Sequence, residues 1–281
     1  MPRVEELLHV APIGGDSYEG LAPERAPRGV FGGQIIGQAL HSAGLFVGDD
    51  ELHPQSLHAY FVAKGTPGIP IRYNLTTLGR GRNTHICSVA AMQGERLLAS
   101  VNASFQRPGK SLSHSTSPRT HVLAPETYPG VEDYPPSYRQ MTRTKEHGVD
   151  VRFPEGGGRL HPEPTDVMEH FAFVFRLLKG QGEEVDALTR ACVLAYVSDL
   201  TLLDALLDRH SMPPGRTSHQ LISYDHTMWF YGLADITRWC LFEQTSPVAD
   251  LGRGLAFGRV YDEDERLLCV VAQEGGVRSR K

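Results

Sequence analysis

Two stretches of the chain carry apolar residues at the spacing of a buried helix. In the first, which spans 31–43, positions 31, 35, 36, 39, 40 and 43 are apolar and glycines lie on the flank. This period predicts a helix, and its glycines allow close packing at a propensity cost of about 1 kcal/mol each. The second helical stretch runs from about Val185 to Arg209, and Ser198 within it can cap a new helix start.

Runs of alternating, β-branched and aromatic residues follow each helical stretch and predict strands. After the first helix they lie near 56–63, 69–79 and 84–106, and after the second near 219–231, 237–245 and 254–277. Turn sequences such as Gln93-Gly94 and Asp262-Glu-Asp-Glu265 favour antiparallel hairpins. One apolar helix wrapped by a hairpin-rich sheet is the hotdog arrangement.

The two halves also resemble each other in three short segments. SLHAYFV (56–62) is similar to YDHTMWF (224–230), which places His58 opposite His226. Leu78-Gly-Arg-Gly81 recurs as Leu251-Gly-Arg-Gly254, and Glu95-Arg-Leu-Leu98 recurs as Glu265-Arg-Leu-Leu268. Three matches in the same order indicate a duplication. The predicted fold class is therefore α+β, a double hotdog made of two tandem hotdog domains whose antiparallel sheets each wrap a central helix.

A segment of different composition separates the halves. Residues 107–164 are rich in Pro, Ser, Thr, His and Gly and lack sustained apolar periodicity, as is typical of a connection. We therefore predict an N-terminal hotdog domain at 1–106, a connecting segment at 107–164 and a C-terminal hotdog domain at 165–281.

Composition narrows the class of protein. With 281 residues, of which 40% are hydrophobic, the chain can bury a substantial core, and its net charge of -5 disfavours binding to nucleic acid or an anionic membrane. The four cysteines form no CxxC pair, which indicates a reducing compartment. Glu5 and Glu6 interrupt any N-terminal signal sequence, and no segment has the length of a membrane span. We expect a cytoplasmic protein that does not bind membranes.

Short segments, in order along both halves, resemble the acyl-CoA thioesterase II family, double-hotdog enzymes of bacteria and peroxisomes. The matching segments are Val30-Phe-Gly-Gly-Gln34, SLHAYF (56–61) with ASFQ (103–106), Tyr196-Val-Ser-Asp-Leu200, Asp225-His-Thr-Met-Trp-Phe230 and Val271-Ala-Gln-Glu-Gly275. The chain departs from the family after His58, where Val-Ala-Lys-Gly replaces the usual Arg-Pro pair before the glycine. The resemblance therefore leaves substrate preference and coenzyme contacts open.

The resemblance implies hydrolysis of acyl-CoA to free fatty acid and coenzyme A, with no cofactor and no metal. Family members direct their hydrolytic water with an Asp, a Ser or Thr and a Gln, and the matching catalytic residues here are Asp199, Ser223 and Gln273, all in the C-terminal domain. A thioester is already activated, so its hydrolysis mainly needs an oriented water and a stabilised oxyanion. Asp199 would be the general base, and Ser223 and Gln273 would hold the water by hydrogen bonds.

Each of these residues also has a purely structural interpretation. Asp199 can be an early-turn helix carboxylate beside a capping Ser198, Ser223 an ordinary strand hydroxyl and Gln273 an edge amide. For His58 and His226 we expect a matched structural role at the strand start rather than catalysis. We expect the cluster Met228-Trp229-Phe230 to form core or acyl-tunnel wall. Three arginines near turn glycines are expected to be solvated: Arg80, Arg82 and Arg253.

Two other functions compete with hydrolysis. A hotdog enoyl-CoA hydratase would need a poised Asp and His pair, but Asp225 and His226 are adjacent in a predicted strand and would point to opposite faces. A non-catalytic acyl-CoA sensor would usually carry a further domain. Serine-hydrolase and metallohydrolase motifs are absent from the sequence. Because hotdog sheets commonly expose edges, we also expect a homo-oligomer, either dimer or tetramer.

Overall fold

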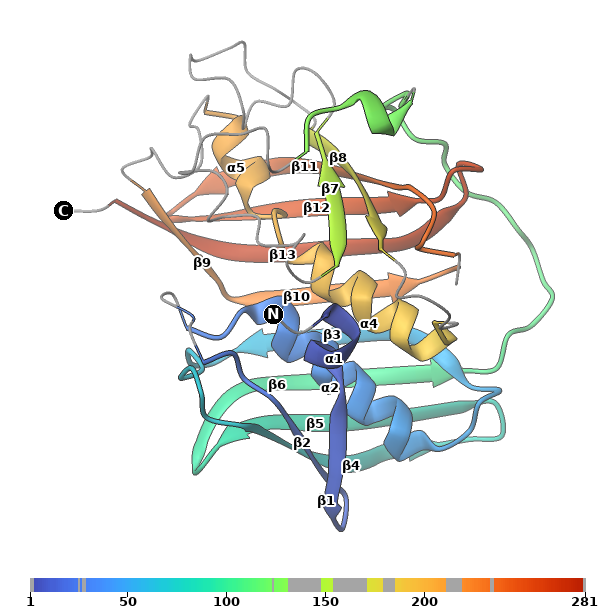
Figure 1. Cartoon of the computed structure of the whole chain (residues 1–281), viewed down its shortest axis with the longest axis vertical. Coiled ribbons are helices and arrows are strands. Elements are labelled where there is room, and N and C mark those ends of the chain that lie inside the picture. The colour runs from blue at the N-terminus through green and yellow to red at the C-terminus, as the bar shows by residue number, and fades with distance from the viewer. Residues whose placement is uncertain are drawn as a thin grey trace.

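The computed structural model describes residues 3–24, 26, 29–122, 124–130, 148–153, 171–178, 185–210, 219–232 and 235–279. Two helices, α2 (Gly32–Val47) and α4 (Ala187–Ser198), lie side by side, and antiparallel strands curve around them (Figure 1). The described strands form one sheet in the order β1-β2-β4-β5-β6-β3-β10-β13-β12-β11-β8-β7, with β9 paired to β13. The arrangement is that of an α+β chain with two helix-and-sheet halves, as predicted.

The first half contains every strand predicted for it. Its elements are α1 (Val4–Leu8), β1 (Val10–Gly14), β2 (Ser17–Gly20), β3 (His53–Phe61), β4 (Ile71–Arg80), β5 (Thr84–Gln93) and β6 (Arg96–Gln106). The run 84–106 is a hairpin that turns at Gly94, whose φ of +59° suits glycine. The sequence analysis missed α1, β1 and β2, because each is too short to show a period.

The second half repeats this strand order, with β7 and β8 at the sheet edge in the places of β1 and β2, and adds α5 and β9. Its elements are η1 (Pro125–Thr127), β7 (Val149–Arg152), β8 (Phe171–Leu177), α5 (Asp204–Asp208), β9 (His219–Ser223), β10 (Asp225–Phe230), β11 (Cys240–Asp250), β12 (Arg253–Tyr261) and β13 (Leu267–Ser279). Strand β7 comes from the segment expected to be a connection, and it pairs with β8. The predicted strand 219–231 is two strands, interrupted at Tyr224.

The short sequence repeats lie at equivalent hairpins. The two Leu-Gly-Arg-Gly segments lie where β4 meets β5 and where β11 meets β12, and the two Glu-Arg-Leu-Leu segments lie where β5 meets β6 and β12 meets β13. Strands β3 and β10 are also equivalent, and they pair antiparallel with each other, joining the halves into one sheet.

The predicted second helix is broken as expected, but Ser198 does not cap a new start. Ser198 is the last residue of α4, and its hydroxyl lies 2.8 Å from the carbonyl oxygen of Ala195 in the preceding turn. A serine hydroxyl beside a helix break can donate to a carbonyl of the preceding turn as well as accept from an amide of the following one.

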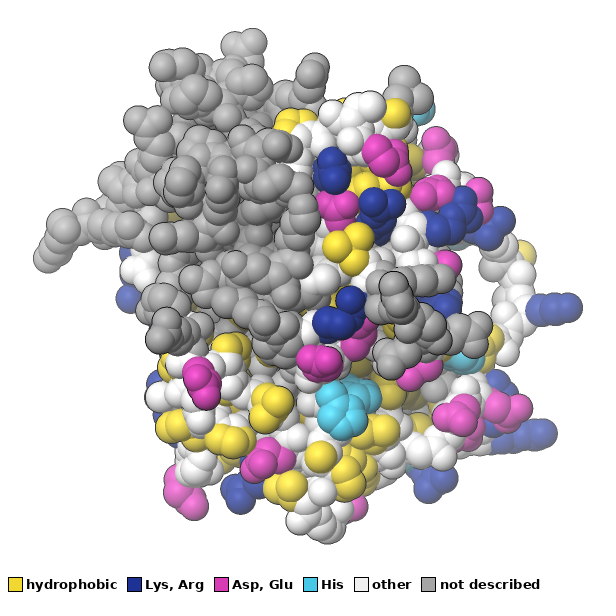
Figure 2. All heavy atoms as spheres, in the orientation of Figure 1, with side chains coloured by type: hydrophobic (Ala, Val, Ile, Leu, Met, Phe, Trp, Pro, Cys, Tyr) yellow, Lys and Arg dark blue, Asp and Glu magenta, His cyan; other side chains and the backbone are white. Residues whose placement is uncertain are grey.

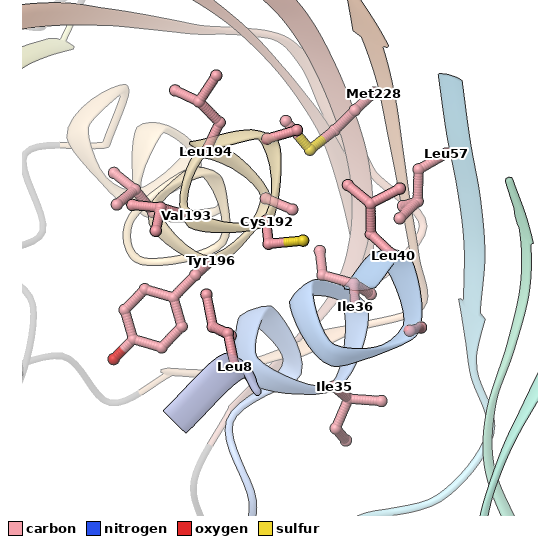
Figure 3. Packing of buried hydrophobic residues seen from close by; sticks show 14 of the residues in the cluster. Leu8, Ile35, Ile36, Leu40, Leu57, Cys192, Val193, Leu194, Tyr196 and Met228 are labelled. Atoms are coloured by element: carbon pink, nitrogen blue, oxygen red, sulfur yellow. The ribbon is translucent and has the colours of Figure 1, made fainter. Parts of the chain in front are cut away.

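Glycine allows α2 and α4 to approach closely. A Cβ on Gly33 would lie 2.6 Å from the carbonyl oxygen of Tyr196, and one on Gly37 would lie 3.1 Å from that of Cys192. Around this contact, apolar side chains from α1, both helices, β3 and β10 form the core (Figure 3). Close packing brings the first turn of α2 to the C-terminal end of α4.

The described surface is mixed in charge. In Figure 2, acidic and basic side chains alternate over the described part of this face rather than gathering in one region. No helix in the described ranges is both long and apolar enough to span a membrane.

Candidate active site

Asp199, Ser223 and Gln273 meet beyond the end of α4. Nε2 of Gln273 lies 2.8 Å from Oδ1 of Asp199 and 2.9 Å from Oγ of Ser223, and donates a hydrogen bond to each. These two bonds use both amide hydrogens. The Ser223 hydroxyl hydrogen therefore stays available for another acceptor, such as a water molecule or a substrate oxygen.

Three elements of the second half deliver these side chains. Asp199 directly follows α4, Ser223 ends β9, and Gln273 lies within β13. Strand β13 pairs with β10 up to Ala272 and with β9 from Gly275 onward. The interruption at Tyr224 therefore lies beside Gln273, and the change of partner strand brings Ser223 to the Gln273 amide.

The first half contributes the start of α2. The backbone N–H of Gly33 donates a hydrogen bond to the Asp199 carboxylate. A Cβ on Gly32 would lie 2.7 Å from Oδ2 of Asp199 and 3.0 Å from the ring of Phe61. The pair Gly32-Gly33 thus leaves room for a carboxylate at a helix N-terminus, where the helix dipole favours negative charge.

The surroundings tune Asp199 towards proton exchange at neutral pH. Its side chain is 6% exposed. Burial raises the pKa of Asp199 to about 7, and the hydrogen bonds from Gln273 and Gly33 act in the opposite direction. A carboxylate with such a pKa can accept a proton near neutral pH and release it again, as a general base must.

His226 lies next to this group, although the sequence analysis did not place it there. Its side chain is fully buried, with Nε2 2.8 Å from the Ser198 hydroxyl and Nδ1 3.9 Å from Oδ1 of Asp199. Burial lowers the pKa of His226 to about 4, and an interaction with the Gln273 side chain opposes that shift. The imidazole is therefore neutral at pH 7.

The expected matched role of the two histidines is wrong. In β10, His226 and Met228 face the helices, whereas in β3 the inward residues are Leu57 and Ala59, so His58 is exposed. The ring of His58 instead packs edge-on against Trp229 on the outer face, 5.6 Å between centroids. Because side chains alternate along a strand, the one-residue offset between the two strands puts the histidines on opposite faces.

The other sequence expectations have separate outcomes. Met228 and Phe230 belong to the core, as predicted, and Trp229 is only partly buried. The three arginines expected to be solvated are exposed, namely Arg80, Arg82 and Arg253. Arg253 also forms an ion pair with Glu274 at 3.2 Å. Asp199 lies after a helix end, so the early-turn interpretation is wrong. Within the described ranges, no group of three or more His, Cys, Asp or Glu side chains could hold a metal ion.

Comparisons with known proteins agree with this architecture. A family model described as acyl-CoA thioesterase matches residues 173–276, and one described as acyl-CoA thioesterase N-terminal domain matches residues 22–106. The chain is 31% identical to acyl-CoA thioesterase 2 of Haemophilus influenzae, over 97% of this chain and 96% of that one. It is 30% identical to human acyl-coenzyme A thioesterase 8, over 98% and 88%.

Solved structures support the same fold. The crystal structure of an acyl-CoA thioesterase II, TesB2, from Mycobacterium marinum matches with a TM-score of 0.77 and 29% identity, covering 99% of each chain. A hotdog-fold protein from Alicyclobacillus acidocaldarius matches with a TM-score of 0.76 and 19% identity, covering 99% of this chain and 98% of that one. The predicted double hotdog fold is confirmed.

Proposed function

This chain belongs to the acyl-CoA thioesterase family, and we propose that it directs its hydrolytic water with Asp199, Ser223 and Gln273. The enzyme hydrolyses acyl-CoA thioesters, so free fatty acid and coenzyme A are the products. The observation that carries the proposal is the position of one amide, that of Gln273, bonded to both a buried carboxylate and a hydroxyl.

In this proposal Asp199 is the general base. A water molecule beside the carboxylate gives it a proton while the oxygen attacks the thioester carbonyl, and the thiolate of coenzyme A leaves when the tetrahedral intermediate collapses. Gln273 fixes the carboxylate, and the free hydroxyl hydrogen of Ser223 orients the water or the substrate oxygen. The step needs no covalent enzyme intermediate, since a thioester is already an activated acyl group.

The first turn of α2 supplies candidate oxyanion donors. The first intrahelical bond of α2 runs from Ile35 N to Phe31 O, so earlier amides have no acceptor within the helix. Gly33 is already bonded to Asp199. The amide of Gly32 is therefore a candidate to bind the developing negative charge.

Release of free thiol from acyl-CoAs of short, medium and long chain tests the proposal. We expect wild type to turn over at least one of them and Asp199→Asn to lose most of kcat while still folding and binding acyl-CoA. Retention of wild-type turnover by Asp199→Asn would overturn the assignment of the base. Binding without thiol release by wild type would instead favour the sensor alternative.

Three further predictions from the sequence accompany this function. The division into 1–106, 107–164 and 165–281 stays a prediction, although β7 of the middle segment pairs with β8. The cytoplasmic location also stays a prediction, and one relative, from Saccharomyces cerevisiae, is called peroxisomal. We further propose a homo-oligomer, which light scattering of the purified protein would detect as a dimer or tetramer mass.

A further inference from the structure

The proposed water-directing residues continue into a second pair of buried polar side chains, Ser198 and His226. Ser198 precedes Asp199 at the end of α4, and His226 lies on β10, beside the β13 strand that carries Gln273. Hydrogen bonds and close approaches link the five side chains in the order Ser198, His226, Asp199, Gln273 and Ser223. The water-directing mechanism gives the first two no role.

Two buried atoms in this group have no hydrogen-bond partner among the described residues: Nδ1 of His226 and Oε1 of Gln273. Yet a side-chain interaction with Gln273 raises the pKa of His226, opposing the effect of burial. An interaction that favours a proton on the imidazole places an acceptor, the Gln273 amide oxygen, towards the ring. Nδ1 of His226 and Oε1 of Gln273 are the atoms left for this interaction, because Nε2 of His226 lies on Ser198 and Nε2 of Gln273 is bonded to Asp199 and Ser223.

The tautomer of His226 follows from its neighbours. The Ser198 hydroxyl has one hydrogen and lies 2.8 Å from both Ala195 O and Nε2 of His226. If the imidazole hydrogen were on Nε2, the lone pair of Nδ1 would face oxygen atoms of Asp199 and Gln273. With the hydrogen on Nδ1, the ring donates towards those oxygens and accepts the Ser198 hydrogen, which is then no longer donated to Ala195 O.

We propose that His226 is a positioning residue whose Nδ1–H, held by the Ser198 hydroxyl on Nε2, fixes the amide of Gln273 and the carboxylate of Asp199. A reversed Gln273 amide would turn Oε1 against the Asp199 carboxylate and leave Ser223 without its donor. His226 prevents this reversal, because its N–H can bond only the oxygen end of the amide. The inference rests on the proposed role of Asp199 as the base.

The pH dependence of turnover can report this role because few titratable groups of the described residues face Asp199. His226 approaches from β10 and Tyr196 from α4. The other groups of this cluster do not titrate: they are the Gly33 amide from α2, the Ser223 hydroxyl from β9 and the Gln273 amide from β13. Asp225 and Glu274 alternate with His226 and Gln273 along their strands and so point to the opposite face.

The decisive comparison is between His226→Phe, which keeps a ring without the N–H, and His226→Asn, which can place an amide N–H near the position of Nδ1. We expect His226→Phe to lower kcat by about 10- to 100-fold with little change in KM, because Asp199 and Gln273 lose their fixed orientation. The acid limb of its kcat profile should move to higher pH, since a donor to the carboxylate is lost. His226→Asn should recover part of both effects, and Ser198→Ala should show a smaller effect in the same direction.

A matched control is His85→Phe, which removes another buried histidine, one bonded to Thr77 on β4 at 3.0 Å. It should alter stability without moving the pH profile. Equal changes in kcat and pH profile for His85→Phe and His226→Phe would overturn the proposal, as would an unchanged profile in His226→Phe. If His226→Phe does not fold, the same readouts on His226→Asn and Ser198→Ala decide. Asp199→Asn separates the two claims: if it abolishes turnover while the His226 variants behave as wild type, only the positioning role fails.

Discussion

The backbone amide of Gly33, at the start of α2, donates a hydrogen bond to the carboxylate of Asp199, at the end of α4. Gly33 belongs to the first half of the chain and Asp199 to the second. The proposed base therefore depends on both halves, although the three residues proposed to direct water come from the second half alone. This explains how a duplicated fold can carry one complete site where the halves meet.

Asp199→Asn should separate binding from chemistry. The amide keeps the size of the side chain but cannot accept a proton, so kcat should fall by about 10² to 10⁴-fold with KM nearly unchanged. For wild type, the pKa of about 7 predicts that the rate rises with pH through this value as the carboxylate ionises. Thiol-release kinetics from pH 5 to 9 measure both effects, and a wild-type rate that falls on raising the pH from 6 to 8 would contradict the assignment.

Ser223 should tolerate threonine but not the loss of its hydroxyl. Ser223→Thr keeps an oxygen that can accept from Gln273 and is suited to a strand, so its turnover should stay near that of wild type. Ser223→Val has nearly the same shape without the hydroxyl, and loss of about 1 to 1.5 kcal/mol of hydrogen bonding corresponds to roughly tenfold in rate. Steady-state kinetics of the pair provide the test. Equal activity of the threonine and valine variants would show that Ser223 is only a strand residue.

The periodic patterns predicted most of the described fold, because long strands and buried helices leave a regular apolar signal. The resemblance to family sequences around Asp199, Ser223 and Gln273 also predicted three residues that the structure brings together. The place of His226 was missed because the sequence repeat aligned it with His58 and concealed the change of face between β3 and β10. The alternation of buried Met228 and Phe230 contained the signal, since it puts His226 on the inner face.

The Ser198 contact could not be predicted for a different reason. A serine next to a helix break can bond to amides ahead, to carbonyls behind or to another element. Only the packing of β10 against the end of α4 brings the Nε2 atom of His226 within 2.8 Å of its hydroxyl. The same limit applies to Gly32, whose need for a small side chain comes from Asp199, far away along the chain.

The stability of the fold should carry a pH signature from Asp199. Its pKa in the folded protein, about 7, lies above the ordinary value of 3.8, so the stability it contributes is present below that ordinary value and is lost as pH rises through 7. Asp199→Asn removes the cost of a buried charge and should raise the free energy of unfolding at pH 8 by up to about 4 kcal/mol, at ~1.4 kcal/mol for each pKa unit. Near pH 4 the two proteins should differ little. Urea unfolding at both pH values tests this, and an equal loss of stability at pH 4 and pH 8 would contradict it.

Two glycine-to-alanine substitutions in α2 should differ in their effect on the site. A Cβ on Gly33 would meet the fixed backbone carbonyl of Tyr196 at 2.6 Å, whereas a Cβ on Gly44 would meet the side chain of Leu188. Because a backbone cannot give way as a leucine side chain can, Gly33→Ala should push α2 from α4, cost about 1 to 3 kcal/mol of stability and weaken the Gly33 bond to Asp199.

Gly44→Ala provides the matched control for this change. It adds the same methyl group to the same helix and brings a similar gain in helix propensity. Its kcat should stay close to that of wild type, while kcat of Gly33→Ala should fall more than its stability alone explains. Thermal unfolding together with thiol-release kinetics at a temperature where all three proteins are folded makes the comparison. If both variants lose kcat equally, the site does not depend on the close approach of the two helix ends, and the Gly33 amide has no special part in holding Asp199.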